Sequence, residues 1–134
     1  TLIDIQLCAH STEEMALAIN TAYDLGAEII LVFGASAIVD RADIIPMALT
    51  SSGGQIVQLG MPVDPGNLLL YGTLKNIPVI GVPSCAASIK ENGFDWVLER
   101  LFAELTVGRD DIAAMAARGL LTEISSRPMP REYV

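Results

Sequence analysis

With 134 residues, the chain is long enough for one domain with a substantial core. Hydrophobic residues make up 51% of it and aromatic residues only 5%, so we expect an aliphatic core, as in a parallel sheet covered by helices on both faces. The formal net charge of −8 argues against nucleic-acid binding, because no basic patch is present to neutralise a phosphate backbone.

The first part of the chain predicts a strand, a helix and a second strand. Residues 2–7 alternate apolar and polar side chains, which is typical of a partly exposed strand. Ser11 and Glu14 fit a capping box, and the helix that follows should stop at Gly26. The continuous apolar run 29–33 indicates a buried strand.

The middle of the chain predicts one helix and two more strands. Asp40 could cap the helix, in which Pro46 is tolerated only if the helix starts late or kinks. Residues 55–59 and 77–82 predict strands, and the segment 60–72 between them predicts an extended arm or a hairpin.

The last part of the chain predicts two helices and a tail. A long helix should start at Ser84 or Ser88 and end at Gly108, and a short helix should follow it. Residues 125–134 contain two prolines and two arginines and little to bury. We therefore expect one domain over residues 1–124 and a linker or terminus after it.

The two cysteines, Cys8 and Cys85, have no disulfide or metal-site spacing, which predicts reduced thiols and a cytoplasmic protein. No apolar run approaches the length of a membrane span, about 18 residues, and no signal peptide is recognisable, so we expect no membrane association. The chain begins with Thr1 inside a predicted strand, which suggests a piece of a longer polypeptide.

Three loops rich in glycine, proline or small residues follow or interrupt the predicted strands. They cover residues 33–37, 63–67 and 81–85. Loops of this kind gather at one edge of an open α/β sheet, where ligands usually bind, and helix N-termini favour anionic groups there. We therefore expect a small-molecule site formed by these loops.

The first loop offers backbone and carboxylate groups. Its small residues 34–37 would let a ligand approach the backbone, although they match neither a dinucleotide fingerprint nor a P-loop; a tight turn chosen for packing is the alternative. Asp40 and Asp43 could share one helix face and hold Mg²⁺ together with substrate phosphates. Helix capping is the alternative for both, and the spacing favours it.

Cys85 and His10 are the remaining candidates for chemistry. Cys85 is predicted in the first turn of a helix, which can activate a thiol as a nucleophile, although a small buried residue is the commoner role. An α/β enzyme with a Cys85 nucleophile is therefore one functional hypothesis. His10 is the only histidine, precedes a helix cap and receives no catalytic role.

Three segments of the chain together carry a family resemblance. Residues 34–40 read Gly-Ala-Ser-Ala-Ile-Val-Asp, residues 64–67 read Asp-Pro-Gly-Asn before an apolar run, and residues 78–86 read Pro-Val-Ile-Gly-Val-Pro-Ser-Cys-Ala. In order and spacing, over about residues 28–90, they resemble the molybdopterin-binding domain of molybdenum cofactor biosynthesis proteins, the family of gephyrin and the bacterial molybdenum-insertion proteins.

The chain departs from the family pattern at several functional positions. Ala35 and Ala37 replace the second glycine and the serine of the first loop, and Asp64 and Asn67 replace the two lysines of the second. Each lost lysine removes a charge-assisted contact to phosphate. Asp40 is kept, and the family's first strand, with its Thr-Gly-x-Glu segment, has no counterpart here.

The resemblance implies an α/β fold: a three-layer α/β/α sandwich with a mostly parallel sheet and ligand loops at the carboxyl edge of its strands. It also implies that Asp40 is the catalytic residue if there is one, and that Asp40 and Asp43 hold Mg²⁺. The implied contacts to molybdopterin come from Gly34, Ala35, Ser36, Pro65, Gly66, Asn67, Pro83, Ser84 and Cys85.

The function that the resemblance implies is binding of molybdopterin, or of a nucleotide form of the molybdenum cofactor, and its hand-over to a partner. Adenylyltransferase or molybdenum-insertion activity stays open, and a non-catalytic scaffold that binds no pterin is the alternative. The family's tendency to oligomerise predicts a homo-oligomer. Residues 92–98 and 127–132 resemble a subgroup in which a cytidylyltransferase-like domain follows, which implies a fused or partner nucleotidyltransferase.

Overall fold

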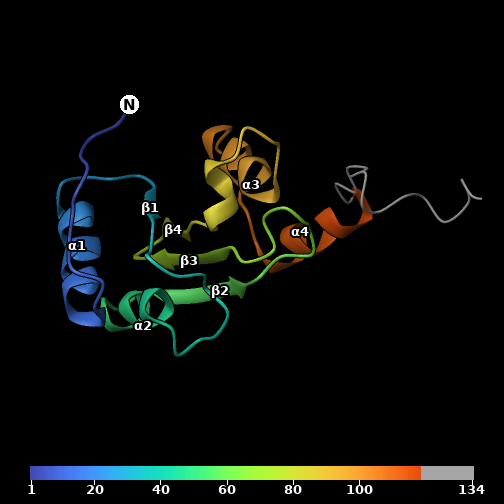
Figure 1. Ribbon diagram of the computed structural model, residues 1–134. Helices are drawn as coiled ribbons and strands as arrows, with labels where there is room; N and C mark the ends of the chain where they lie inside the picture. The colour runs from blue at the N-terminus through green and yellow to red at the C-terminus, as the bar shows by residue number, and fades with distance from the viewer. Residues whose placement is uncertain (119–134) are drawn as a thin grey trace, which may run out of the picture.

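The computed structural model describes residues 1–118, and the predicted linker over 125–134 lies outside them (Figure 1). Along the chain, a helix, a strand and a second helix come first, three consecutive strands follow, and the last part holds two α-helices and two short 3₁₀ turns. The elements are α1 (Thr12–Asp24), β1 (Ile30–Val32), α2 (Ile44–Ser51), β2 (Gln55–Leu59), β3 (Leu70–Leu74), β4 (Ile77–Gly81), η1 (Ser84–Ala87), α3 (Gly93–Phe102), α4 (Arg109–Ala114) and η2 (Met115–Arg118).

The fold is α/β, as predicted, but the sheet is mixed rather than mostly parallel. Its strand order is β1-β4-β3-β2, with β1 parallel to β4 and the other two pairs antiparallel. The turn at Lys75 and Asn76 explains the difference. Both residues have positive φ (45° and 74°), as in the two-residue turns that join antiparallel strands, so β3 and β4 must form a hairpin.

Helices pack on both sides of the central strands because successive side chains of a strand point to opposite faces. On one face, Leu70 and Leu74 of β3 join a buried cluster with residues of α1 and α2. On the other face, Leu69 and Tyr71 join a second cluster with residues of α3 and α4. The buried core is therefore split into two parts by the sheet.

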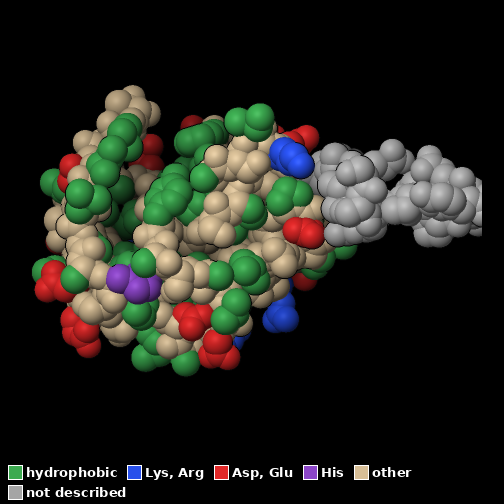
Figure 2. Space-filling view, in the orientation of Figure 1, with side chains coloured by type: hydrophobic (Ala, Val, Ile, Leu, Met, Phe, Trp, Pro, Cys, Tyr) green, Lys and Arg blue, Asp and Glu red, His purple; other side chains and the backbone are tan. Residues whose placement is uncertain are grey.

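The β1 side of the sheet is less covered than its centre. Residues 2–7 have the predicted alternation but form no strand, and Leu7 is 97% exposed. Leu31 and Phe33, which belong to the apolar run predicted as a buried strand, are 38% and 68% exposed. In Figure 2 the N-terminal segment, with hydrophobic side chains along it, stands across a hollow from the rest of the molecule.

The ends of α1 were predicted correctly from capping residues, whereas the predicted starts of α2 and α3 need correction. Ser11 Oγ accepts the Glu14 N–H at 3.3 Å, and Gly26 follows α1 with a φ of 86°. Asp40 does not cap α2: that helix starts after Asp43, which puts Pro46 in its first turn, where no amide proton is needed. The long helix predicted from Ser84 or Ser88 is instead η1 followed by α3.

Candidate functional site

The three loops singled out from the sequence leave the same edge of the sheet. Parallel pairing sets the end of β1 beside the end of β4, with Val32 opposite Gly81. Because β3 is antiparallel to β4, its start lies at the same edge, with Leu70 opposite Gly81. Because β2 is antiparallel to β3, its end lies there too, with Leu59 opposite Leu70. The expectation that these loops gather at one edge is confirmed, in the order first, third and second loop.

At the β1 end of this edge, His10 lies along the first loop. Its Nδ1 accepts the backbone N–H of Ala35 at 3.5 Å, and its Nε2 is 3.4 Å from Ser36 Oγ. An imidazole nitrogen accepts only when it carries no proton, so the neutral tautomer that fits this contact carries its proton on Nε2 and donates to Ser36 Oγ. In this tautomer His10, purple in Figure 2, positions the first loop and is not a base for the Ser36 hydroxyl.

Gly34 allows this close approach. A Cβ at this position would lie 3.2 Å from His10 Cε1 and 2.7 Å from Ile45 Cδ1. The contact between His10 and the first loop could not be predicted from the sequence, because Ala35 follows His10 by 25 positions.

Asp40 and Asp43, in the segment between the first loop and α2, bind the backbone of that segment. Asp43 Oδ2 accepts the N–H groups of Val39 and Asp40, at 2.8 and 2.9 Å, and Asp40 Oδ1 accepts the Ala42 N–H at 2.7 Å. The hydrogen bond from Val39, followed by that from Asp40, lowers the pKa of the Asp43 carboxyl group. Within residues 1–118, no three or more His, Cys, Asp or Glu side chains form a group that could hold a metal ion.

The second loop packs tightly against the start of α3. Gly66 is buried with a φ of 118°, and a Cβ there would lie 2.7 Å from the backbone nitrogen of Gly93. Gly93 N–H donates to the Pro65 carbonyl at 2.9 Å, and the Asn67 carbonyl accepts the Met61 N–H at 3.0 Å. The backbone of Pro65 and Gly66 therefore serves packing, and the exposed side chain of Asn67 is the group that stays available.

The third loop does not open a long helix. Ser84 and Cys85, after the buried Pro83, lie in the four-residue turn η1, so the dipole expected at this position is small. The fully buried Asn92 holds the loop instead: its Nδ2 donates to the Cys85 carbonyl at 3.4 Å and its Oδ1 accepts the Phe94 N–H at 2.8 Å. Asn92 ties the third loop to the start of α3, a role that the sequence did not suggest.

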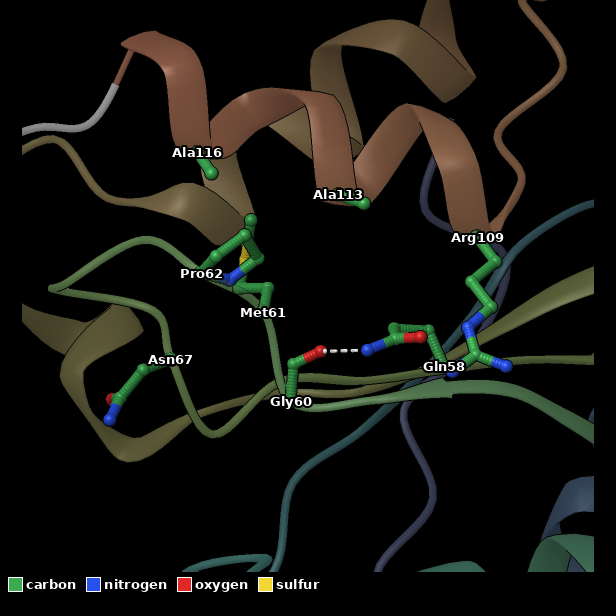
Figure 3. Close-up of a pocket in the computed structure, with 8 residues that line it drawn as sticks. All are labelled: Gln58, Gly60, Met61, Pro62, Asn67, Arg109, Ala113 and Ala116. Carbon is green, nitrogen blue, oxygen red and sulfur yellow. Dashed lines mark hydrogen bonds between the residues drawn. The ribbon is translucent and has the colours of Figure 1, made fainter.

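An open pocket of about 620 Å³ lies at the β2 end of the edge (Figure 3). Of the predicted binding residues, it includes only Asn67. Its lining is Gln58, Gly60, Met61, Pro62, Asn67, Arg109, Ala113 and Ala116.

One residue of the sequence, outside the three loops, pointed to this pocket. Arg109 is the first residue of α4, directly before Asp110 and Asp111. A cation is unfavourable at a helix N-terminus, where acidic residues are preferred, so an arginine there calls for another role.

Comparison of the chain with protein-family models, with curated proteins and with solved structures gave no match in any of the three cases. The resemblance to molybdopterin-binding domains therefore depends on the three sequence segments alone. Among residues 1–118, no helix combines the length and the apolar character needed to cross a membrane.

Proposed function

We propose that this domain binds molybdopterin or a nucleotide form of the molybdenum cofactor and passes it to a partner protein or domain. The observation that carries the proposal is the convergence of three sequence segments, far apart in the chain, on one edge of the sheet. These are the segments that resemble the family, and this edge is where α/β sheets bind ligands. Helices on both sides of β3 and β4 support a three-layer α/β/α arrangement.

The donor groups of the first loop fit Mg²⁺ only when the ligand supplies phosphate oxygens as well. Backbone N–H groups take Asp43 Oδ2 and Asp40 Oδ1, which leaves the other oxygen of each carboxylate for a cation. Mg²⁺ is commonly held by one or two carboxylates together with water and substrate phosphates. Bound there, Mg²⁺ would neutralise phosphate charge beside the Gly34–Ser36 backbone.

Binding and hand-over fit this chain better than chemistry. His10 is not placed as a base for Ser36, and Asp64 and Asn67 stand where the family has lysines. A transferase partner, such as a nucleotidyltransferase domain, would then supply the missing groups. Self-association, also part of this proposal, is tested by light scattering on the purified protein, and a monomeric mass at all concentrations would contradict it.

Calorimetric titration with molybdopterin and with its adenylylated and cytidylylated forms, each with and without Mg²⁺, tests the proposal. We expect Mg²⁺-dependent binding that Asp40→Ala weakens about tenfold or more, because a charge-assisted contact contributes about 1.5–3 kcal/mol. Asp24→Ala is the matched control, since it removes an exposed carboxylate at the end of α1. Folded protein that binds none of the three ligands would favour the scaffold alternative.

A further inference from the structure

We infer that the pocket at the β2 end is a binding site for a small organic phosphate, with Arg109 holding the phosphoryl group. This inference goes beyond the proposed function, since Arg109 and Gln58 lie outside all three loops and the ligand need not be a pterin. The first loop and this pocket are at opposite ends of the loop-bearing edge, next to β1 and β2. Substitutions at one end therefore leave the other intact.

The shape of the pocket separates an apolar side from a polar end. The apolar side of the pocket comes from the segment that directly follows β2, with Met61 and Pro62, and from the helical segment of α4 and η2, with Ala113 and Ala116 (Figure 3). Arg109 and Gln58 lie together at another end of the pocket, away from Asn67 (Figure 3). A volume of about 620 Å³ is within the range of small-molecule sites, roughly 300–1,000 Å³.

The polar end has one cation and one oriented amide. Gln58 Nε2 donates to the Gly60 carbonyl at 2.9 Å and to the Leu59 carbonyl at 3.4 Å, so its Oε1 is left as an acceptor. Arg109 is the only charged residue among the eight that line the pocket. Its planar guanidinium matches the oxygens of a phosphoryl group in a bidentate arrangement.

The surroundings favour an anion at Arg109 in particular. The whole chain carries a formal net charge of −8, so an anion is repelled by most of the surface and attracted where a cation is presented. The acidic neighbours do not line the pocket, and Asp111 Oδ2 is engaged by the Gly108 N–H at 2.7 Å. The apolar side then suits the base or another flat, apolar part of the ligand.

Titration of the full chain with adenosine monophosphate and with pyrophosphate, followed by calorimetry at low salt, tests the inference. We expect both probes to bind, and Arg109→Gln to weaken both about tenfold or more. Lys75→Gln is the matched control: it also removes one positive charge, in the β3–β4 turn at the opposite edge of the sheet, and should leave both affinities unchanged. No binding to the wild type, or equal losses in the two variants, would overturn the inference.

A second variant tests the apolar side without removing charge. Ala113 is exposed on α4 and lines the pocket, so Ala113→Leu fills space that an adenine base would use. We expect this variant to bind pyrophosphate as the wild type does and to bind adenosine monophosphate more weakly. An unchanged affinity for adenosine monophosphate would show that the nucleoside lies outside the pocket, against the inference.

Discussion

The two ends of the loop-bearing edge use their polar groups differently. At the β1 end, Asp40, Asp43 and His10 bond to the backbone between β1 and α2. At the β2 end, Arg109 and the Oε1 atom of Gln58 face an open pocket. Residues that resemble a ligand-binding motif can thus have part of their hydrogen-bonding capacity used by the turn that they build, while groups outside the motif stay open to a ligand.

The comparison separates two kinds of variant. Changes at the β1 end should act first on the conformation of the first loop, and changes at Arg109 should act on binding with little effect on stability. The glycines and the buried amide that join the second and third loops to α3 hold this edge together. Their replacement should have the largest effects on the free energy of unfolding.

Gly66→Ala should be the most damaging single change. The positive φ of 118° strains any other residue, and the added Cβ would meet the backbone of Gly93, which cannot move as a side chain can. We expect the free energy of unfolding to fall by about 3 kcal/mol or more, measured by urea denaturation. Gly53→Ala is the control: its φ of 92° carries similar strain, but a Cβ there meets nothing within 4 Å. If both variants lose the same free energy of unfolding, the close contact between Gly66 and the start of α3 contributes nothing beyond the backbone strain.

Asn92→Ala should rank second. It leaves the Phe94 N–H and the Cys85 carbonyl without their partner in a buried place, which should lower the free energy of unfolding by about 1–3 kcal/mol. Asn92→Ser keeps a helix-capping oxygen but cannot reach the Cys85 carbonyl, so it should lose less. If the serine variant is as unstable as the alanine variant, the whole loss of stability comes from the bond to the Cys85 carbonyl in the third loop, and capping of α3 contributes nothing.

Signals that act over a few residues were predictable, and contacts between distant segments were not. Ser11 and Gly26 bound α1 as predicted, because capping is decided within one turn of helix. The direction of β3 depends on which strand it pairs with, and that follows from the turn at Lys75 and Asn76, whose positive φ values the residue types did not reveal. The alternation of residues 2–7 describes the side chains correctly, but a strand also needs a paired neighbour, and none lies beside it within the described part of the chain.

The candidate site shows the same limit. The positions of all three loops at one edge followed from the order of strands, but the pocket combines Gln58 at the end of β2 with Arg109 on α4. No spacing rule links residues that far apart. The unfavourable position of Arg109 at an acidic helix start was the only local trace of that site.

Asp43→Asn should change how stability depends on pH. The backbone N–H groups of Val39 and Asp40 hold the pKa of Asp43 below the usual value for an aspartate, so the ionised carboxylate stabilises the folded state. That contribution is complete above the unfolded pKa and is lost as the pH falls through the folded pKa. The difference in unfolding free energy between wild type and variant should therefore shrink below about pH 4. A difference that stays constant from pH 2 to pH 7 would contradict this account.

Ser36→Ala should have the smallest effect on stability and the clearest local signature. Its bond to His10 spans 3.4 Å at an exposed position, so removing the hydroxyl should change the free energy of unfolding by less than about 0.5 kcal/mol. The imidazole should nevertheless keep its proton on Nε2, because the Ala35 N–H continues to donate to Nδ1. Long-range ¹H–¹⁵N spectra report this tautomer directly. A proton found on Nδ1 would mean that His10 can accept the Ser36 hydroxyl proton, and the first loop would then hold a potential nucleophile and base rather than a structural contact.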